Sequence, residues 1–158
     1  MKRSWRKNLA WALIVFALMW ASYLAIMPWY NHAYNNHYPN QAALKNTPSP
    51  ADMAPWPTVI ILVPILEEII FRGGPLFLFI LVAREMITDK RKKKLLALLI
   101  IIASGITFSL MHYHNGGIYQ LPPILILLAI HGALLMFLAI KTKNIYCSIV
   151  LHAAWNAM

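Results

Sequence analysis

Long apolar runs alternate with short polar segments along the chain, and this alternation predicts a set of membrane-spanning helices. Apolar stretches cover residues 8–30, 57–83, 95–112 and 121–140, and a shorter one covers 145–158. An α-helix needs about 20 mostly apolar residues to cross the hydrocarbon core of a bilayer. The pattern therefore predicts an all-α, polytopic transmembrane helical bundle with about five membrane segments.

Composition and charge support a membrane protein. The chain of 158 residues is 60% hydrophobic with a mean hydropathy of +0.59, and its formal net charge is +9. The basic residues gather at the chain start, at 90–94, and at Lys141 and Lys143, which is the distribution that flanks apolar spans on the cytoplasmic side. We therefore expect a multi-pass protein of a bacterial cell membrane with a cytoplasmic N-terminus, and no nucleic-acid partner.

The first 56 residues are expected to form an N-terminal transmembrane anchor and an external loop. The run at 8–30 is longer than the apolar core of a signal peptide and ends in no A-x-A site. Residues 31–56 are polar, almost uncharged and rich in Asn, Pro, His and Tyr, which indicates a partly irregular loop. The remaining residues, 57–158, are expected to form the functional core.

The second apolar segment carries two adjacent acidic residues, Glu67 and Glu68, although the chain has only five acidic residues in all. Ionisable groups at bilayer depth cost about 2.5–3.5 kcal/mol each on insertion scales, so they usually have a partner or a function. Arg72 follows Glu68 by four residues and lies on the same helix face, which predicts an ion pair. Glu67 has no such partner in its own helix and is the candidate general base or ligand.

A triplet of helix-breaking residues follows these carboxylates. Gly73-Gly74-Pro75 is expected to break or kink the second segment. Interrupted helices at membrane depth occur where they line a cavity or are buried in protein. The interruption therefore falls beside the candidate site.

Polar residues on two other segments can meet Glu67 in the bundle. His112 ends the third segment, and His152 and Asn156 share one face of the fifth because they are four residues apart. A glutamate with a histidine can deprotonate a water molecule, and a second histidine with an amide can donate hydrogen bonds to an oxyanion. The same Glu67, His112 and His152 could instead hold a zinc ion with an open position. Both schemes predict amide hydrolysis, and whether the cofactor is a divalent metal or none stays open.

The polar residues form three motifs on separate apolar segments, and their order resembles that of the CAAX-protease and bacteriocin-processing (Abi) family of intramembrane endopeptidases. The family includes the type II CAAX prenyl endopeptidase, and many bacterial members serve bacteriocin immunity or peptide processing. The resemblance covers about residues 57–158. The motifs are Glu67-Glu68-x-x-x-Arg72, Phe108-x-x-x-His112 and His152-x-x-x-Asn156.

The resemblance implies a role for each motif residue. Glu67 would be the catalytic carboxylate and His112 its partner in water activation. His152 and Asn156 would form the oxyanion site. Glu68 and Arg72 would be a supporting ion pair. The family is described both as metalloprotease-like and as metal-free, and the same residues would serve either mechanism.

The resemblance predicts an intramembrane endopeptidase that hydrolyses a peptide or membrane-protein substrate in bacteriocin self-immunity or peptide processing. The alternative is a non-catalytic membrane immunity or binding protein with the same fold. A small ion or proton transporter would also use buried Glu and His, but the chain shows no inverted repeat.

The site requires a particular geometry of the third segment. Counting from the basic loops, His112 lies near the outer end of its span, whereas Glu67 and His152 lie nearer the middle of theirs. A tilt, or a helix that begins within the lysine run, would bring them together. Outside the motifs, His131 and Gly132 are expected to pack against a neighbouring helix, as is Gly105, and Cys147 to be inert.

Overall fold

The computed structural model describes residues 2–37, 57–113 and 117–158, and these residues form helices without a β-strand. All five apolar segments predicted from the sequence are helical. The all-α membrane bundle is therefore confirmed. The elements are α1 (Lys2–His37), η1 (Thr58–Leu62), α4 (Val63–Glu68), η2 (Ile69–Gly73), α5 (Gly74–Glu85), α6 (Lys90–Tyr113), η3 (Gly117–Gln120), α7 (Pro122–Thr142) and α8 (Tyr146–Asn156).

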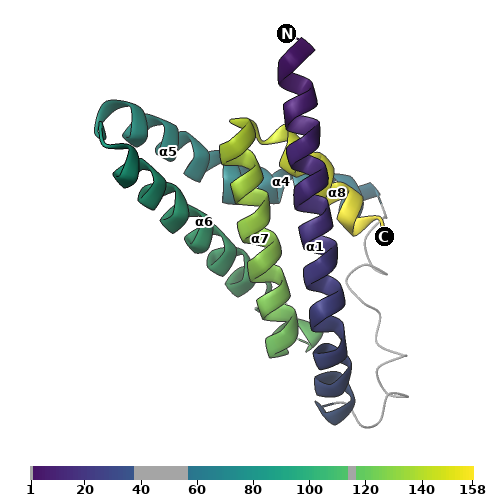
Figure 1. The fold of residues 1–158 in the computed structure, drawn as a ribbon. Coiled ribbons are helices and arrows are strands. Elements are labelled where there is room, and N and C mark those ends of the chain that lie inside the picture. Colours follow the sequence, from purple (N-terminus) through teal and green to yellow (C-terminus); the bar gives the residue numbers. More distant parts are fainter. Residues whose placement is uncertain (1, 38–56, 114–116) are drawn as a thin grey trace.

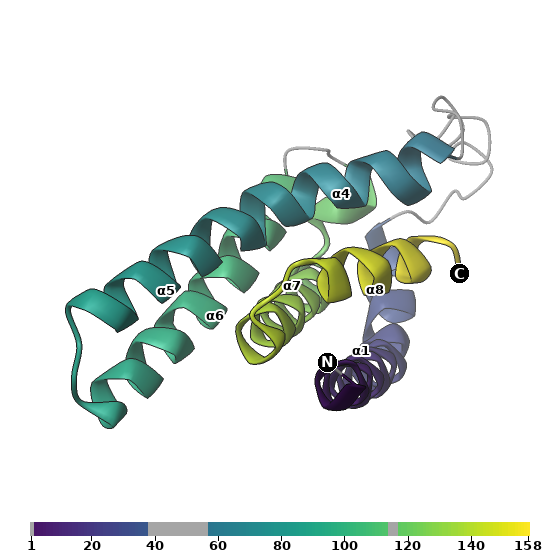
Figure 2. The same cartoon turned by 90° about the horizontal axis from the view of Figure 1, so that it is seen from above.

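Among the residues that the structure describes, three helices are long and apolar enough to cross a membrane. They cover Trp5–Asn36, Lys90–Tyr113 and Pro122–Thr142, with mean hydropathies of 2.1, 2.2 and 2.5 in their most apolar windows. Figure 1 shows α1 and α7 upright and side by side, with α6 inclined beside α7. Figure 2 views α1 and α7 nearly end-on and shows α4 and α5 lengthwise, so this segment lies across the upright helices.

The first helix extends further than the sequence indicated. Residues 31–37, expected to begin the external loop, continue α1 to His37, and the rest of that loop lies outside the described residues. The helix continues because side chains four residues apart interact along it. Asn36 Nδ2 lies 3.1 Å from His32 Nε2, and the rings of Tyr30 and Tyr34 are 5.7 Å apart.

The second segment stays helical through the glycines instead of unwinding. Gly73 has φ −61° and ψ −55°, and Gly74 has φ −59° and ψ −56°, so both keep right-handed helical dihedrals. The interruption is a widened π-helical turn at Ile69–Gly73, closed by the bond from the Gly74 N–H to the Ile69 carbonyl oxygen. A second π-helical turn, η1, precedes α4. Single π turns of this kind are frequent at functional sites.

The third helix begins earlier than its apolar run. The basic residues Lys90–Lys94, expected in a loop, form the first turns of α6. Asp89 supports this start because its Oδ1 accepts a 2.6 Å bond from the Arg91 backbone N–H. The early start within the lysine run, together with the incline of α6 in Figure 1, gives the geometry that a contact between His112 and Glu67 requires.

Two glycines let α6 and α7 approach closely, as expected from the sequence. A Cβ at Gly105 would clash with the carbonyl oxygen of Ala129 on α7. A Cβ at Gly132 would lie 3.0 Å from the Cβ of Phe108. Small residues of this kind allow close packing of membrane helices. The contact holds the Phe108 side chain between α6 and α7, next to the candidate site.

The buried core joins α1 to α7 and α8. Val15 and Met19 of α1 pack with Leu135 and Leu138 of α7 and with Leu151 of α8. The basic start of α1, the α5–α6 connection and the end of α7 all lie at the upper end of the molecule in Figure 1. One end of the bundle therefore carries the three basic clusters that the positive-inside pattern predicted.

Candidate active site

The two adjacent glutamates face different surroundings. Glu68 is fully buried, and its Oε1 lies 3.1 Å from Nη1 of Arg72, which is also fully buried. The expected ion pair at i and i+4 is therefore present. The Glu67 side chain is 21% exposed and points toward two histidines. One helix thus supplies a buried carboxylate and an accessible carboxylate at successive positions.

His152 connects the fifth segment to the buried pair. Its Nδ1 lies 2.9 Å from Glu68 Oε1, the oxygen that also meets Arg72. A carboxylate oxygen accepts hydrogen bonds, so Nδ1 of His152 donates here. This bond fixes the orientation of the imidazole and turns its Nε2 toward Glu67, at 3.5 Å from Oε2.

His112 reaches the opposite oxygen of the same carboxylate. Its Nδ1 lies 2.9 Å from the backbone carbonyl oxygen of Phe108, so Nδ1 is again the donor. Its Nε2 lies 3.7 Å from Glu67 Oε1. Glu67, His112 and His152 therefore meet at one point, although they come from three different helices.

The hydrogen bonds at both Nδ1 atoms leave no donor among the atoms of Glu67, His112 and His152 that face one another. With both Nδ1 atoms engaged, a neutral imidazole presents only a lone pair at Nε2. Two such lone pairs and the Glu67 carboxylate are all acceptors. The separations of 3.5 and 3.7 Å exceed a direct hydrogen bond and match a polar contact bridged by a small donor. A proton, a water molecule or a cation between these groups would satisfy them.

The buried guanidinium is held from several sides. Arg72 Cζ lies 4.4 Å from the centre of the Phe108 ring, in cation–π contact, and Nη2 donates to the Gly132 carbonyl oxygen at 3.4 Å. Phe108 also contacts both histidine rings, with centroids 4.5 Å from His112 and 5.7 Å from His152. Phe108 is a packing residue, as its sequence position suggested, and it lies at the centre of the site.

The remaining predicted residue, Asn156, lies one turn beyond His152 and is exposed. Its Nδ2 donates to the Val59 carbonyl oxygen at 3.4 Å, on the helical segment that leads to Glu67. Within the described residues, no side-chain hydrogen bond joins Asn156 to Glu67, His112 or His152. The amide therefore lies at the margin of the cluster, bound to η1, the turn that precedes the helix with the carboxylates.

Some contacts of the site had no signal in the sequence. The bond between Glu68 and His152 spans 84 positions, and the acceptor for Arg72 at Gly132 is a backbone oxygen. Tyr119, in the short helix after α6, places its ring 5.8 Å from that of His112. Neither backbone acceptors nor contacts between distant segments leave a residue pattern that a single sequence could show.

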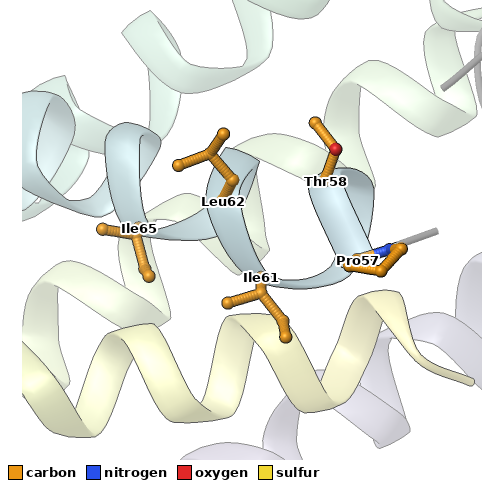
Figure 3. A pocket seen from close by; sticks show the side chains of 5 residues that line it. All are labelled: Pro57, Thr58, Ile61, Leu62 and Ile65. Atoms are coloured by element: carbon orange, nitrogen blue, oxygen red, sulfur yellow. The ribbon is translucent and has the colours of Figure 1, made fainter. Parts of the chain in front are cut away.

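A shallow apolar pocket of about 250 Å³ lies on the same helical segment, ahead of the carboxylates. Figure 3 shows its lining side chains, with Ile61 pointing toward α8. Ile65 is two residues before Glu67, so the pocket and the Glu67 side chain lie on different faces of the helical segment. It is lined by Pro57, Thr58, Ile61, Leu62 and Ile65.

The donor set of the site resembles that of a metal site in kind. Glu67 and the two Nε2 atoms are zinc ligands in kind, and their Nδ1 atoms have the outer partners that such histidines usually have. In the part of the chain that the structure describes, however, no group of three His, Cys, Asp or Glu side chains is arranged to hold a metal ion. The residues are therefore metal ligands in kind, and the metal-free alternative is the one that the described geometry favours.

Comparison with known proteins agrees with the motifs and the helical fold. Residues 49–158 match the model of the family described as type II CAAX prenyl endopeptidase Rce1-like. No curated protein and no solved structure matches the chain. The family match covers more than half of the chain and confirms the resemblance drawn from the three motifs. The chain therefore belongs to the Rce1-like family of type II CAAX prenyl endopeptidases, a family of intramembrane proteases that act on peptide substrates.

Proposed function

We propose that this chain hydrolyses peptide bonds with a water molecule activated by Glu67 and His112. The observation that carries the proposal is the convergence of the Glu67 carboxylate with two imidazole Nε2 atoms at 3.5 and 3.7 Å. A water molecule at this point would find acceptors for its protons at the Glu67 carboxylate and at Nε2 of His112. The part-exposed Glu67 side chain leaves access for a substrate, whereas the fully buried Glu68 does not.

The proposed reaction proceeds through a tetrahedral intermediate. Glu67, assisted by His112, takes a proton from water, and the oxygen attacks the carbonyl carbon of the substrate. The carbonyl electron pair moves to oxygen. When the intermediate collapses, the carbon–nitrogen bond breaks and the leaving amine takes the proton from Glu67. The products are a carboxylic acid and an amine, and the glutamate returns to its starting state.

We propose that His152 and Asn156 stabilise the oxyanion. Asn156 has a second amide hydrogen beyond the one that binds Val59. His152 can donate from Nε2 only when both of its ring nitrogens carry hydrogen, because Nδ1 already binds Glu68. Charge balance supports this form. Two carboxylates and one guanidinium leave one net negative charge, and one proton on the cluster neutralises it.

The buried Glu68–Arg72 pair is proposed to position His152 and not to contact the substrate. Glu68 Oε1 binds both Arg72 and His152, so the guanidinium fixes the carboxylate that orients the imidazole. Removing either partner would leave an uncompensated charge in the bundle. The pair is therefore a structural support for the reacting groups.

The biological setting is proposed from the family. We propose that the core is residues 57–158, that residues 1–56 are an anchor and external loop, and that the protein spans a bacterial cell membrane several times. The common position of the basic segments in Figure 1 supports a cytoplasmic face at that end. The proposed task is bacteriocin self-immunity or peptide processing.

A paired cellular assay tests the proposal. Cells that express the wild-type protein or the Glu67→Gln variant are compared for protection against, or maturation of, a co-encoded peptide, with membrane levels matched by blot. Glu85→Gln, in which the altered residue is exposed at the end of α5, is the matched control. Loss of function in Glu67→Gln alone supports proteolysis. Full function in Glu67→Gln would instead support a binding protein with the same fold.

A further inference from the structure

A groove separate from the proposed active site lies between the starts of α1 and α8. Its volume is about 390 Å³, and one wall comes from each helix. Figures 1 and 2 both show α8 beside α1. The α1 wall lies outside residues 49–158, the part of the chain that matches the family model. The groove is lined by Trp5, Asn8, Leu9, Ala12, Tyr146, Cys147, Val150, Leu151 and Ala154.

The groove is apolar and open at its rim. Trp5 is 56% exposed, Tyr146 71% and Val150 68%, so large apolar side chains border it without covering it. The helix α1 is long and apolar enough to cross a membrane, so this surface would lie in the bilayer. The apolar molecules that surround it there are the acyl chains of lipids. An acyl chain is the occupant whose chemistry matches these walls.

Positive charge lies at the mouth of the groove. Arg6 Cζ is 5.8 Å from the centre of the Trp5 ring, which lines the groove, and Arg6 is exposed. The sequences of α1 and α8 contain no acidic residue. An apolar groove with a cation at its mouth complements a lipid with an apolar tail and an anionic head group. Basic residues near a membrane surface each contribute about 1 kcal/mol to binding of anionic lipid.

We infer that the groove binds one anionic phospholipid, with an acyl chain between α1 and α8 and its phosphate near Arg6. The site is separate from the proposed chemistry. Val150 and Ala154 lie on the side of α8 opposite His152, because each is two residues away from it along the helix. The lipid bridges the N-terminal helix to the helix that carries His152, and it stabilises that docking.

The single cysteine of the chain provides a direct probe, because Cys147 is partly buried and lines the groove. The purified full chain in neutral detergent is mixed with phosphatidylglycerol or with phosphatidylcholine of the same acyl chains. The rate of Cys147 modification by an apolar maleimide is measured, and bound lipids are counted by native mass spectrometry. Phosphatidylglycerol is expected to slow the modification at lower concentration and to remain bound as one molecule per chain.

Two variants separate the tail contact from the head-group contact. Ala154→Phe fills the groove and should abolish the retained lipid, whereas Ala103→Phe, at an exposed position of α6, is the size-matched control. Arg6→Gln should lower the ratio of phosphatidylglycerol affinity to phosphatidylcholine affinity about fivefold. This fold-change corresponds to about 1 kcal/mol for the loss of one basic residue. Helix content by circular dichroism checks that each variant is folded.

Three results would overturn the inference. Equal binding of the two lipids would show non-selective annular lipid only. Retention of the lipid in folded Ala154→Phe would place it elsewhere. Unchanged Cys147 modification in wild type at saturating phosphatidylglycerol would show an empty groove, and this measurement needs no variant. None of these results bears on whether Glu67 is catalytic.

Discussion

The buried Glu68 and the accessible Glu67 are one residue apart, and their surroundings differ in almost every respect. Glu68 is fully buried and has contacts of 2.9 and 3.1 Å to His152 and Arg72. Glu67 is part-exposed and lies 3.5 and 3.7 Å from the two imidazoles. The inner carboxylate has close, fixed partners, and the outer one is part-exposed and has longer contacts. In the proposed mechanism, one helix therefore carries both a supporting group and a reacting group.

The largest expected effect is on the activity of the outer carboxylate. Glu67→Gln keeps the shape of the side chain and removes its basicity, so peptide hydrolysis should fall by about 10²–10⁴-fold. Thermal unfolding in detergent should change little, because Glu67 lies outside the buried pair. A large loss of stability in this variant would contradict the distinction between the two carboxylates.

The inner pair should instead govern stability. Arg72→Ala leaves the buried Glu68 without its cation, and the free energy of unfolding should fall by about 3–5 kcal/mol. Unfolding in mixed detergent and SDS micelles measures this change. The double variant Arg72→Ala with Glu68→Gln removes both charges and should recover part of the loss. If the single and double variants are equally unstable, the charge argument fails and packing accounts for the effect.

A smaller loss of stability is expected when Phe108, whose ring lies over the Arg72 guanidinium, is changed. Phe108→Leu keeps an apolar side chain but removes the cation–π contact at 4.4 Å, which should cost about 1–2 kcal/mol of stability. The same titration in micelles reads this change. Combining Phe108→Leu with Arg72→Ala should then add less than the sum of the two single losses. Full additivity would mean that the ring and the guanidinium do not interact.

The smallest expected effect comes from chelation. The proposed reaction uses residues of the chain alone, so o-phenanthroline should leave hydrolysis by the purified protein unchanged. Activity is measured before and after treatment, with metal content read by elemental analysis. Loss of activity that added zinc restores would assign Glu67, His112 and His152 to a metal and would replace the proposed role of Glu67 as a free base.

The sequence predicted the parts of the site that depend on local spacing. Four-residue intervals placed Arg72 beside Glu68, and the order of three motifs identified the family. It did not predict that His152 binds Glu68, because that contact depends on how α8 crosses the second segment. It also did not predict the path of the second segment, which lies across α1 and α7 instead of beside them (Figure 2). Packing between helices decides both, and no local pattern encodes it.

A local pattern also does not locate the ends of helices, so the bounds of α1 and α6 differ from those expected from the sequence. Apolar runs mark which residues can enter a bilayer, whereas helices continue as long as backbone and side-chain contacts sustain them. The helix α1 therefore extends to His37, and α6 begins at Lys90 within its basic run. The start of α6 within the lysine run is one of the two alternatives that the sequence left open, and α6 is also inclined to α7 (Figure 1).

The widened turn at Ile69–Gly73 has a consequence for how the segment tolerates changes in length. A π-helical turn holds one residue more than the α-helical turn it replaces, so it is equivalent to a single-residue insertion. Deleting Ile70 would allow an ordinary α-helical turn, and α5 would keep the face that packs on α6, because the widened turn completes one revolution with one residue more. The carboxylates precede the turn and would also keep their places. The turn therefore absorbs a change of one residue in length without changing the register of either helix.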